Sequence, residues 1–246
     1  MLLEGRNAVV YGAAGTIGRG VARAFAREGA RVHLAGRTPD ALADVASEIE
    51  AAGGMVETAR VDALDERAVA DHADAVAGGS GSVDISINLI SVGEVFGTPL
   101  AEITLADFER PVITAVRSTF LTARAAARHM IRQGSGVILT FGGYGVPLSD
   151  FHLGGFQVAL SAVDSLRLQL AAELGPYGIR VLTVQSVGVV EPSGERDMTD
   201  SVVARTMLKR GATAEDVGNV AAFAASDHAR TMTATALNVT CGAEIG

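Results

Sequence analysis

The sequence predicts a doubly wound α/β fold, in which a mostly parallel sheet of about seven strands carries helices on both faces. Short apolar runs of strand length alternate with longer amphipathic runs of helix length along the whole chain. No linker, repeat or low-complexity tract interrupts this alternation, so we expect a single domain over residues 1–246. Strands that alternate with helices form right-handed βαβ units, whose ligands lie at the carboxyl ends of the strands.

Each predicted strand is a short apolar run rich in β-branched residues. In chain order the predicted strands are 7–12, 31–36, 55–61, 83–90, 136–141, 179–187 and 234–240. The predicted helices are 16–28, 40–52, 65–77, 103–133, 156–174, 199–209 and 214–225. Pro39 stands at the start of a helix, where its missing N–H is harmless. Pro111 predicts a break or kink in the long helix.

The composition excludes several classes of protein. The chain has a net charge of −8 and no basic run, which argues against a nucleic-acid partner. Its one cysteine, Cys241, excludes an internal disulfide and a zinc–thiolate cluster, and no metal site is expected. We find no signal peptide and no apolar window of transmembrane length, so we expect no membrane association. The sequence therefore predicts a cytoplasmic protein that binds a small molecule.

A glycine-rich turn follows the first predicted strand and opens the first helix, in the segment YGAAGTIGRG. Glycine is needed where φ is positive or where a phosphate approaches the backbone. The free N–H groups and the helix dipole then favour an anion. This pattern predicts a nucleotide-phosphate site, although a tight turn alone would also need glycines. The residues expected to contact the phosphates are Gly12, Gly15, Thr16, Ile17 and Gly18.

The ends of the second and third strands bear on the choice of nucleotide. Arg37 stands where an arginine would accommodate a 2′-phosphate, and no acid stands there for a ribose hydroxyl. The sequence therefore favours NADP(H) over NAD(H), although a solvated surface arginine would look the same. Asp62 is interpreted either as an acceptor for an adenine amino group or as a helix cap.

The chain resembles the short-chain dehydrogenase/reductase family over nearly its whole length. The segments that carry the resemblance are NAVVYGAAGTIGRGVARAFAREGARVHLAGR, VDISIN, STFLTARAAARHM, LAAELGPYGIRVLTV and LNVTCG. The resemblance implies a Rossmann-type sheet, an NAD(P)(H) cofactor and cofactor contacts at Asp62, Ala63 and Asn88. It also implies a homo-oligomer, a tetramer or a dimer, formed through the two long helices. These helices are apolar on more faces than one sheet can cover.

The resemblance also shows where this sequence departs from the family's chemistry, which rests on Asn, Ser, Tyr and Lys. The asparagine position falls on Ala115, and the serine position falls on Gly142, with Gly143 as the adjacent option. The tyrosine and lysine positions, four residues apart on one helical face, fall on Phe156 and Leu160. A phenylalanine has no proton to donate, and a leucine cannot hydrogen-bond a ribose. We therefore expect that the usual carbonyl reduction is absent.

Two other side chains are candidate proton donors. Tyr144 follows the fifth strand, and we interpret it either as an acid or as a packing aromatic in a glycine-rich loop. His152 has a suitable ordinary pKa, and it is either an acid or a plain loop histidine. The remaining histidines are interpreted as structural in a strand (His33) or solvated on helices (His72, His129 and His228).

Three functions remain open at this point. The first is an NADP-dependent oxidoreductase of altered chemistry, which reduces an acceptor that needs no protein acid. The second is a catalytically silent protein that binds NADP(H) or a metabolite. The third is a non-redox enzyme, such as a cyclase or hydrolase, that uses the same pocket. The glycine turn favours the first two, and the family default favours the first.

Overall fold

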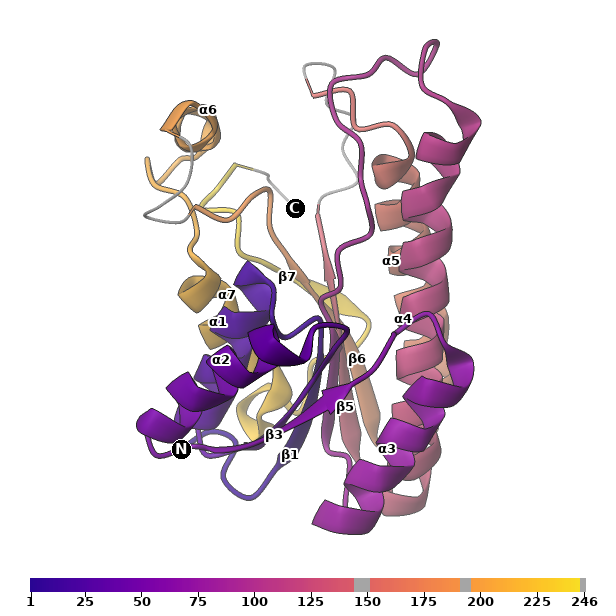
Figure 1. Cartoon of the computed structure of the whole chain (residues 1–246), viewed down its shortest axis with the longest axis vertical. Helices are drawn as coiled ribbons and strands as arrows, with labels where there is room; N and C mark the ends of the chain where they lie inside the picture. The colour runs from indigo at the N-terminus through magenta and orange to yellow at the C-terminus, as the bar shows by residue number, and fades with distance from the viewer. Residues whose placement is uncertain (144–150, 191–195, 244–246) are drawn as a thin grey trace.

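The computed structural model describes residues 1–143, 151–190 and 196–243. Its strands form one seven-stranded sheet in the order β3-β2-β1-β4-β5-β6-β7, and every neighbouring pair is parallel (Figure 1). The strands are β1 (Asn7–Tyr11), β2 (Arg31–Gly36), β3 (Met55–Arg60), β4 (Ile85–Asn88), β5 (Gly136–Gly142), β6 (Ile179–Gln185) and β7 (Thr235–Asn238). The doubly wound fold predicted from the sequence is confirmed.

Helices cover both faces of the sheet. The helices of the described residues are α1 (Thr16–Arg27), α2 (Pro39–Ala51), α3 (Glu66–Ser80), α4 (Leu105–Gln133), α5 (Gly155–Leu174), α6 (Arg196–Arg205) and α7 (Ala214–Ala225). One face carries α1, α2 and α7, and the other carries α3, α4 and α5 (Figure 1). The strand order reverses between β1 and β4. Folds of this type bind their ligands at that reversal, beyond the carboxyl ends of the strands.

Two apolar cores lie on the two faces of the sheet. On the first face, Phe25 of α1 is fully buried against β1 and β2 residues such as Val10 and Leu34. On the second face, Leu121 and Met130 of α4 pack under the other side of the same strands. Complete burial of a side chain as large as Phe25 contributes about 2 kcal/mol. The alternation of inward and outward side chains along each strand supplies both cores.

Helices α1 and α7 approach each other more closely than side chains would allow. A Cβ on Gly20 of α1 would lie 2.5 Å from the Ala214 carbonyl oxygen. A Cβ on Gly218 of α7 would lie 2.6 Å from the Gly20 carbonyl oxygen. The two glycines therefore let the helix backbones touch, and they fix α7 against the helix that follows the glycine-rich turn.

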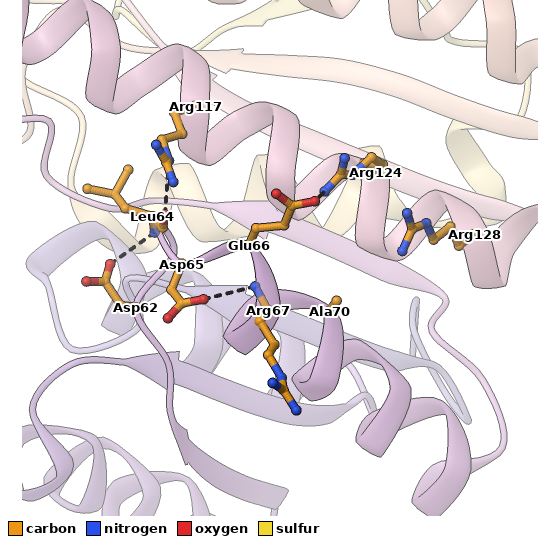
Figure 2. A pocket seen from close by; sticks show the side chains of 9 residues that line it. All are labelled: Asp62, Leu64, Asp65, Glu66, Arg67, Ala70, Arg117, Arg124 and Arg128. Carbon is orange, nitrogen blue, oxygen red and sulfur yellow. Dashed lines mark hydrogen bonds and ion pairs between the residues drawn. The ribbon is translucent and has the colours of Figure 1, made fainter.

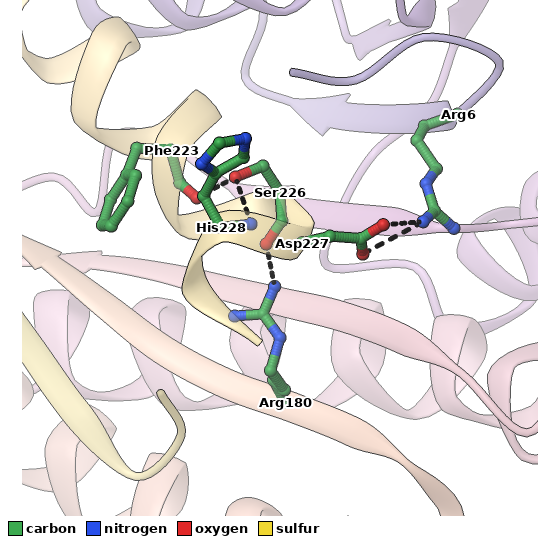
Figure 3. A network of polar contacts seen from close by, with 6 residues as sticks. All are labelled: Arg6, Arg180, Phe223, Ser226, Asp227 and His228. Atoms are coloured by element: carbon green, nitrogen blue, oxygen red, sulfur yellow. Dashed lines mark hydrogen bonds and ion pairs between the residues drawn. The ribbon is translucent and has the colours of Figure 1, made fainter. Parts of the chain in front are cut away.

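A half-buried arginine holds the far end of α7 to the sheet (Figure 3). Arg180 of β6 donates hydrogen bonds to the carbonyl oxygens of Ala224, at 2.8 Å, and Ser226, at 3.0 Å. The Ala224 carbonyl lies in the last turn of α7, where carbonyl groups lack partners within the helix, and the Ser226 carbonyl also accepts the Ala229 N–H at 3.2 Å. Burial lowers the pKa of Arg180. The nearby pair between Arg6 and Asp227, at 3.1 Å, is exposed and contributes little by comparison.

Most predicted strands overrun the observed ends by one or two residues. The first strand ends at Tyr11 because Gly12 adopts a φ of +76°, and the last begins after Ala234, whose φ is +55°. Helix α6 spans Arg196–Arg205, so the predicted 199–209 helix is placed too late. Lys209 has a φ of +53°, which a right-handed helix excludes.

The long helix is not broken at Pro111, because α4 runs through it from Leu105 to Gln133, and a kink there stays a prediction. The helix begins after Thr104, whose hydroxyl oxygen accepts a hydrogen bond from the Asp107 backbone at 3.1 Å. A proline at this position removes only the N–H that would have bonded the Asp107 carbonyl. Pro111 is itself buried, so its packing offsets part of that loss.

The prediction that His72 and His129 are solvated is also wrong. His129 is 8% exposed, and its Nε2 lies 2.8 Å from an Asp74 carboxylate oxygen. The ring of His72 packs edge-on against the buried Tyr11, with ring centroids 5.9 Å apart. His33 is buried in β2, as expected, and His228 is exposed. Periodicity failed here because it reports the faces of a helix but not the depth of the groove between two helices.

His72 should make stability depend on pH. Burial, with a smaller repulsion from His33, lowers the pKa of His72 from 6.5 to about 4. The unfolded chain therefore binds more protons between about pH 4 and 6.5, and stability present at pH 7 is lost as pH falls through that window. The loss approaches about 3 kcal/mol at the low end.

We expect His72→Phe, which keeps an aromatic ring against Tyr11, to lose less stability between pH 7 and pH 5 than the native chain. The difference should be about 2 kcal/mol, measured by urea unfolding at the two pH values. His33 is present in both proteins, so the comparison isolates His72. Equal losses in the two proteins would refute this assignment.

Candidate functional site

The site forms at the reversal between β1 and β4, where the chain leaves β1. Gly12 has a φ of +76°, and a Cβ there would lie 2.5 Å from the Leu89 carbonyl oxygen and 2.7 Å from the Ile90 nitrogen. A Cβ on Gly18 would lie 2.2 Å from the Gly12 carbonyl oxygen. These contacts press the first turn of α1 onto the end of β1. Two of the three predicted glycines are therefore required by the local geometry.

Gly15 is different, because the fold does not require a glycine there. It has an extended φ of −73°, and its Cβ would meet only the Gly12 oxygen, at 3.4 Å. It is exposed, as is Thr16. No side chain caps α1, and the N–H groups of Thr16, Ile17 and Gly18 precede the first helical hydrogen bond, which Arg19 donates to Gly15. This end of the helix fits the phosphate groups of a nucleotide.

The ends of β2 and β3 border the same region. Arg37 is exposed just after β2, and within the described part of the chain its guanidinium has no hydrogen-bond or ion-pair partner. Asp62 is exposed after β3, and its carboxylate accepts a hydrogen bond from the Leu64 backbone at 3.0 Å. The alternative that Asp62 caps α3 is wrong, because Asp65 accepts from the first-turn N–H groups. Ala63 is 4% exposed between the two acids.

Asn88 braces the end of β4 against α4. Its amide nitrogen donates to the Ser118 hydroxyl at 2.9 Å and to the Thr119 hydroxyl at 3.4 Å. Its amide oxygen accepts a hydrogen bond from the Ile90 backbone at 3.4 Å. No sequence pattern pointed to Ser118 and Thr119, although both stand within four positions of Ala115 on the same helix.

The residues that the resemblance assigns to the family's Ser and Lys positions meet where β5 ends and α5 begins. A Cβ on Gly143 would lie 3.2 Å from a Leu160 methyl carbon, and one on Gly142 would lie 3.9 Å from the other. Phe156 stands one helical turn before Leu160, and its ring meets that of Phe96 edge-on, with centroids 5.8 Å apart. Phe96 lies in a loop without periodicity, so no sequence signal pointed to it.

Ala115, at the asparagine position, belongs to a small apolar cluster between α4 and α5. Ala159 and Val163 of α5 complete this cluster, and the partly buried Val92 and Val112 pack against it. Ala159 is the neighbour of Leu160 in the chain. None of the side chains at the positions Ala115, Gly142, Gly143, Phe156 and Leu160 has a titratable group. These side chains can therefore exclude water and orient a ligand, but they cannot transfer a proton.

The two candidate proton donors have different outcomes. Tyr144 lies outside the described residues, as does Asp150, which the sequence places two residues before His152. His152 is exposed in the segment before α5, with a φ of +45°. Its position is that of a loop histidine near the site.

Comparisons with known proteins agree with this geometry. The family model described as enoyl-(acyl carrier protein) reductase matches residues 12–244. The chain is 31% identical to gluconate 5-dehydrogenase of Gluconobacter oxydans, over 91% of this chain and 89% of that protein. It is 29% identical to 7α-hydroxysteroid dehydrogenase of Escherichia coli, over 98% of this chain and 94% of that protein. None of the helices in the described residues combines the length and apolarity needed to cross a membrane.

A solved structure supports the same class of protein. The crystallised 7α-hydroxysteroid dehydrogenase complexed with NADH and 7-oxo glycochenodeoxycholic acid superposes with a TM-score of 0.89. The identity is 26%, and the match covers 99% of this chain and 97% of that chain. The sheet order and the glycine turn define an α/β protein with an NAD(P)-binding Rossmann-type fold. The chain belongs to the short-chain dehydrogenase/reductase family.

The two glycines of the α1 turn should respond differently to substitution. We expect Gly18→Ala to destabilise the fold by about 1 to 3 kcal/mol, because its Cβ meets backbone that cannot move away. Gly15→Ala should change stability by less than about 1 kcal/mol. Urea unfolding of both variants measures the difference. Equal destabilisation would mean that Gly15 also has a structural role.

Proposed function

We propose that this protein is an NADP(H)-binding member of its family whose oxidoreductase chemistry does not use the family's protein acid. One observation supports this proposal above the others. The glycine turn that fits a dinucleotide is intact, while the residues assigned to the family's Ser, Tyr and Lys positions carry no polar side chain, with Gly143 beside Leu160 and Phe156 against Phe96. The usual reduction of simple carbonyls is therefore not the expected reaction.

The preference for NADP(H) over NAD(H) rests on Arg37. Its guanidinium is exposed after β2 and has no partner among the described residues, so it is available to a 2′-phosphate. Gly12, Gly15 and the first N–H groups of α1 would hold the pyrophosphate, and Asp62 and Ala63 would face the adenine. The nicotinamide end fits less well, because Leu160 offers no hydrogen bond to a ribose.

When bound, NADPH supplies a hydride. The residues of this chain restrict which acceptor can use it. Phe156 and Leu160 place an apolar surface where an acid would stand, so the acceptor must not need a proton from that helix. An iminium ion, or a conjugated acceptor whose enolate is stabilised otherwise, satisfies this condition. Tyr144 or water would supply any later proton, and a small molecule with an apolar surface would fit the site.

A silent binding protein is the second candidate function. The replacement of every proton-relay position, together with the missing ribose contact at Leu160, favours it. If the protein is a silent binder, we expect that it binds the cofactor and that no turnover follows. A non-redox enzyme, such as a cyclase or hydrolase, is a weaker candidate, because it gives no reason for the retained glycine turn. The single cysteine, Cys241, agrees with a cytoplasmic location, which we also propose.

Cofactor binding is the first test of this function. We expect NADPH to raise the melting temperature by mass action, and to do so at lower concentration than NADH. Arg37→Gln should remove most of the difference between the two dinucleotides. Gly15→Ala should weaken the binding of both NADPH and NADH, because the new methyl group would occupy the phosphate side of the turn. If neither dinucleotide raises the melting temperature, the proposed function is wrong.

Turnover then separates the two candidates. With NADPH, we expect no reduction of simple ketones, and activity only on preformed iminium ions or conjugated acceptors. Absorbance at the dihydronicotinamide band reports turnover. Tyr144→Phe is the matched variant, and a loss of turnover with an unchanged melting temperature would support Tyr144 as the acid. Tight binding with no turnover across the panel would favour the silent binder.

We also propose a homo-oligomer, a tetramer or a dimer, formed through α4 and α5. Exposed apolar side chains on these helices include Ile113, Val158 and Leu168. Sedimentation equilibrium should give a mass of two or four chains, and Leu168→Glu should shift it toward one chain. A native protein that sediments as a monomer would contradict this proposal.

A further inference from the structure

A cavity of about 670 Å³ opens between α3 and α4, on the side of the turn that follows β3 (Figure 2). Helix α4 contributes Arg117, Arg124 and Arg128 to its wall. The turn and the first residues of α3 contribute Asp62, Asp65 and Glu66. The three arginines are not among the residues assigned to the dinucleotide site. They gather on one helix of a chain whose net charge is −8.

The spacing of the arginines explains why they share one face of α4. They stand seven and four residues apart, which are helical repeats of that face. Leu121, between the first two, is 6% exposed and belongs to the core. The arginines therefore project from the edge of the buried stripe into the groove beside α3.

Protein contacts hold two of these arginines in place. The Nε–H of Arg117 donates to the Leu64 carbonyl oxygen at 3.0 Å. Arg124 pairs with Glu66 at 2.5 Å, and its guanidinium lies 5.0 Å from the centre of the Phe120 ring. Side chains that are already ordered lose less conformational entropy when a ligand binds. The wall is thus partly organised for a ligand.

Some hydrogen-bond donors that line the cavity have no acceptor among the described residues. The terminal amino groups of Arg117 and the whole guanidinium of Arg128 have no acceptor among the described residues. The carboxylates opposite accept backbone N–H groups, at Leu64 for Asp62 and in the first turn of α3 for Asp65, and these neutral donors leave both negative charges in place. The fourth arginine of the lining, Arg67, pairs outward with Asp71 at 3.5 Å. Arg117 and Arg128 therefore offer open hydrogen-bond donors to a ligand.

We propose that this cavity binds an oligophosphate, a small molecule with two or more linked phosphate groups. The first and third arginines are eleven residues apart, or about 16 Å along the helix axis. A single carboxylate reaches only one guanidinium, whereas a chain of phosphates can contact several, each through paired N–H groups. Leu64 and Ala70 are the only apolar residues of the described lining, so an apolar ligand fits poorly.

The test is a calorimetric titration of the full-length protein with sodium tripolyphosphate at low ionic strength, where such contacts are strongest. We expect saturable binding that Arg128→Gln weakens about tenfold, because one charge-assisted contact is lost. Arg117→Gln should weaken it to a similar extent. Arg128 is exposed and has no partner among the described residues, so its variant should keep the native melting temperature even if the Arg117 variant does not.

Two arginines outside the cavity supply matched controls. Arg37→Gln removes a charge at the expected dinucleotide site, and Arg230→Gln removes an exposed charge that lies against a different cavity. Arg230→Gln should leave tripolyphosphate binding within about twofold of native, because it loses no contact in this cavity, and Arg37→Gln measures the share of the anion that is held at the dinucleotide site. ATP should bind no tighter than tripolyphosphate at this site, because the described lining has no aromatic side chain to stack on the base.

Four results would overturn the proposal. The first is no binding at millimolar tripolyphosphate. The second is a loss on Arg37→Gln larger than on Arg128→Gln, which would place the anion on the dinucleotide turn. The third is an equal loss on Arg230→Gln, which would indicate non-specific attraction. The fourth is much tighter ATP binding that depends on Arg128, which would make the ligand a nucleotide.

Discussion

The backbone contact between Gly12 and the segment after β4 constrains the whole carboxyl edge of the sheet. Because Leu89 and Ile90 pass within 3 Å of where a Gly12 side chain would be, the chain must leave β1 in the left-handed region. That exit directs the first turn of α1 back over the strand ends, and Gly18 lets it pack there without a gap. The free N–H groups of α1, the end of β2 and the Asn88 brace take their positions from this one turn.

Much of the fold could be predicted from the sequence, because alternating periodicity and turn glycines are local signals. The order of elements and the parallel sheet follow from them, as do the glycines of the turn. Burial in grooves between helices could not be predicted, since it depends on packing partners far apart in the chain. His72 and His129 were misplaced for this reason. No break forms at Pro111, because the helix continues through this residue and its ring is buried.

The candidate site, like the fold, could be predicted from the sequence only in part. Leu160, which the resemblance assigns to the lysine position, lies beside Gly142 and Gly143 at the end of β5. The contact of Phe156 with Phe96 and the role of Ser118 and Thr119 in holding Asn88 needed coordinates. A Cβ on Gly143 would start 3.2 Å from a Leu160 methyl carbon, which is a tight contact, whereas one on Gly142 would make only ordinary contacts.

The direct backbone contact of Gly20 with Ala214 and Gly218 links the two ends of the chain. During synthesis α1 emerges early, but the surface that α7 will cover stays open until nearly two hundred further residues have been made. Helix α1 can therefore gain its contact with α7 only after the last part of the chain has emerged. A nascent chain of this family member would present an unpaired helix flank to chaperones for most of its translation.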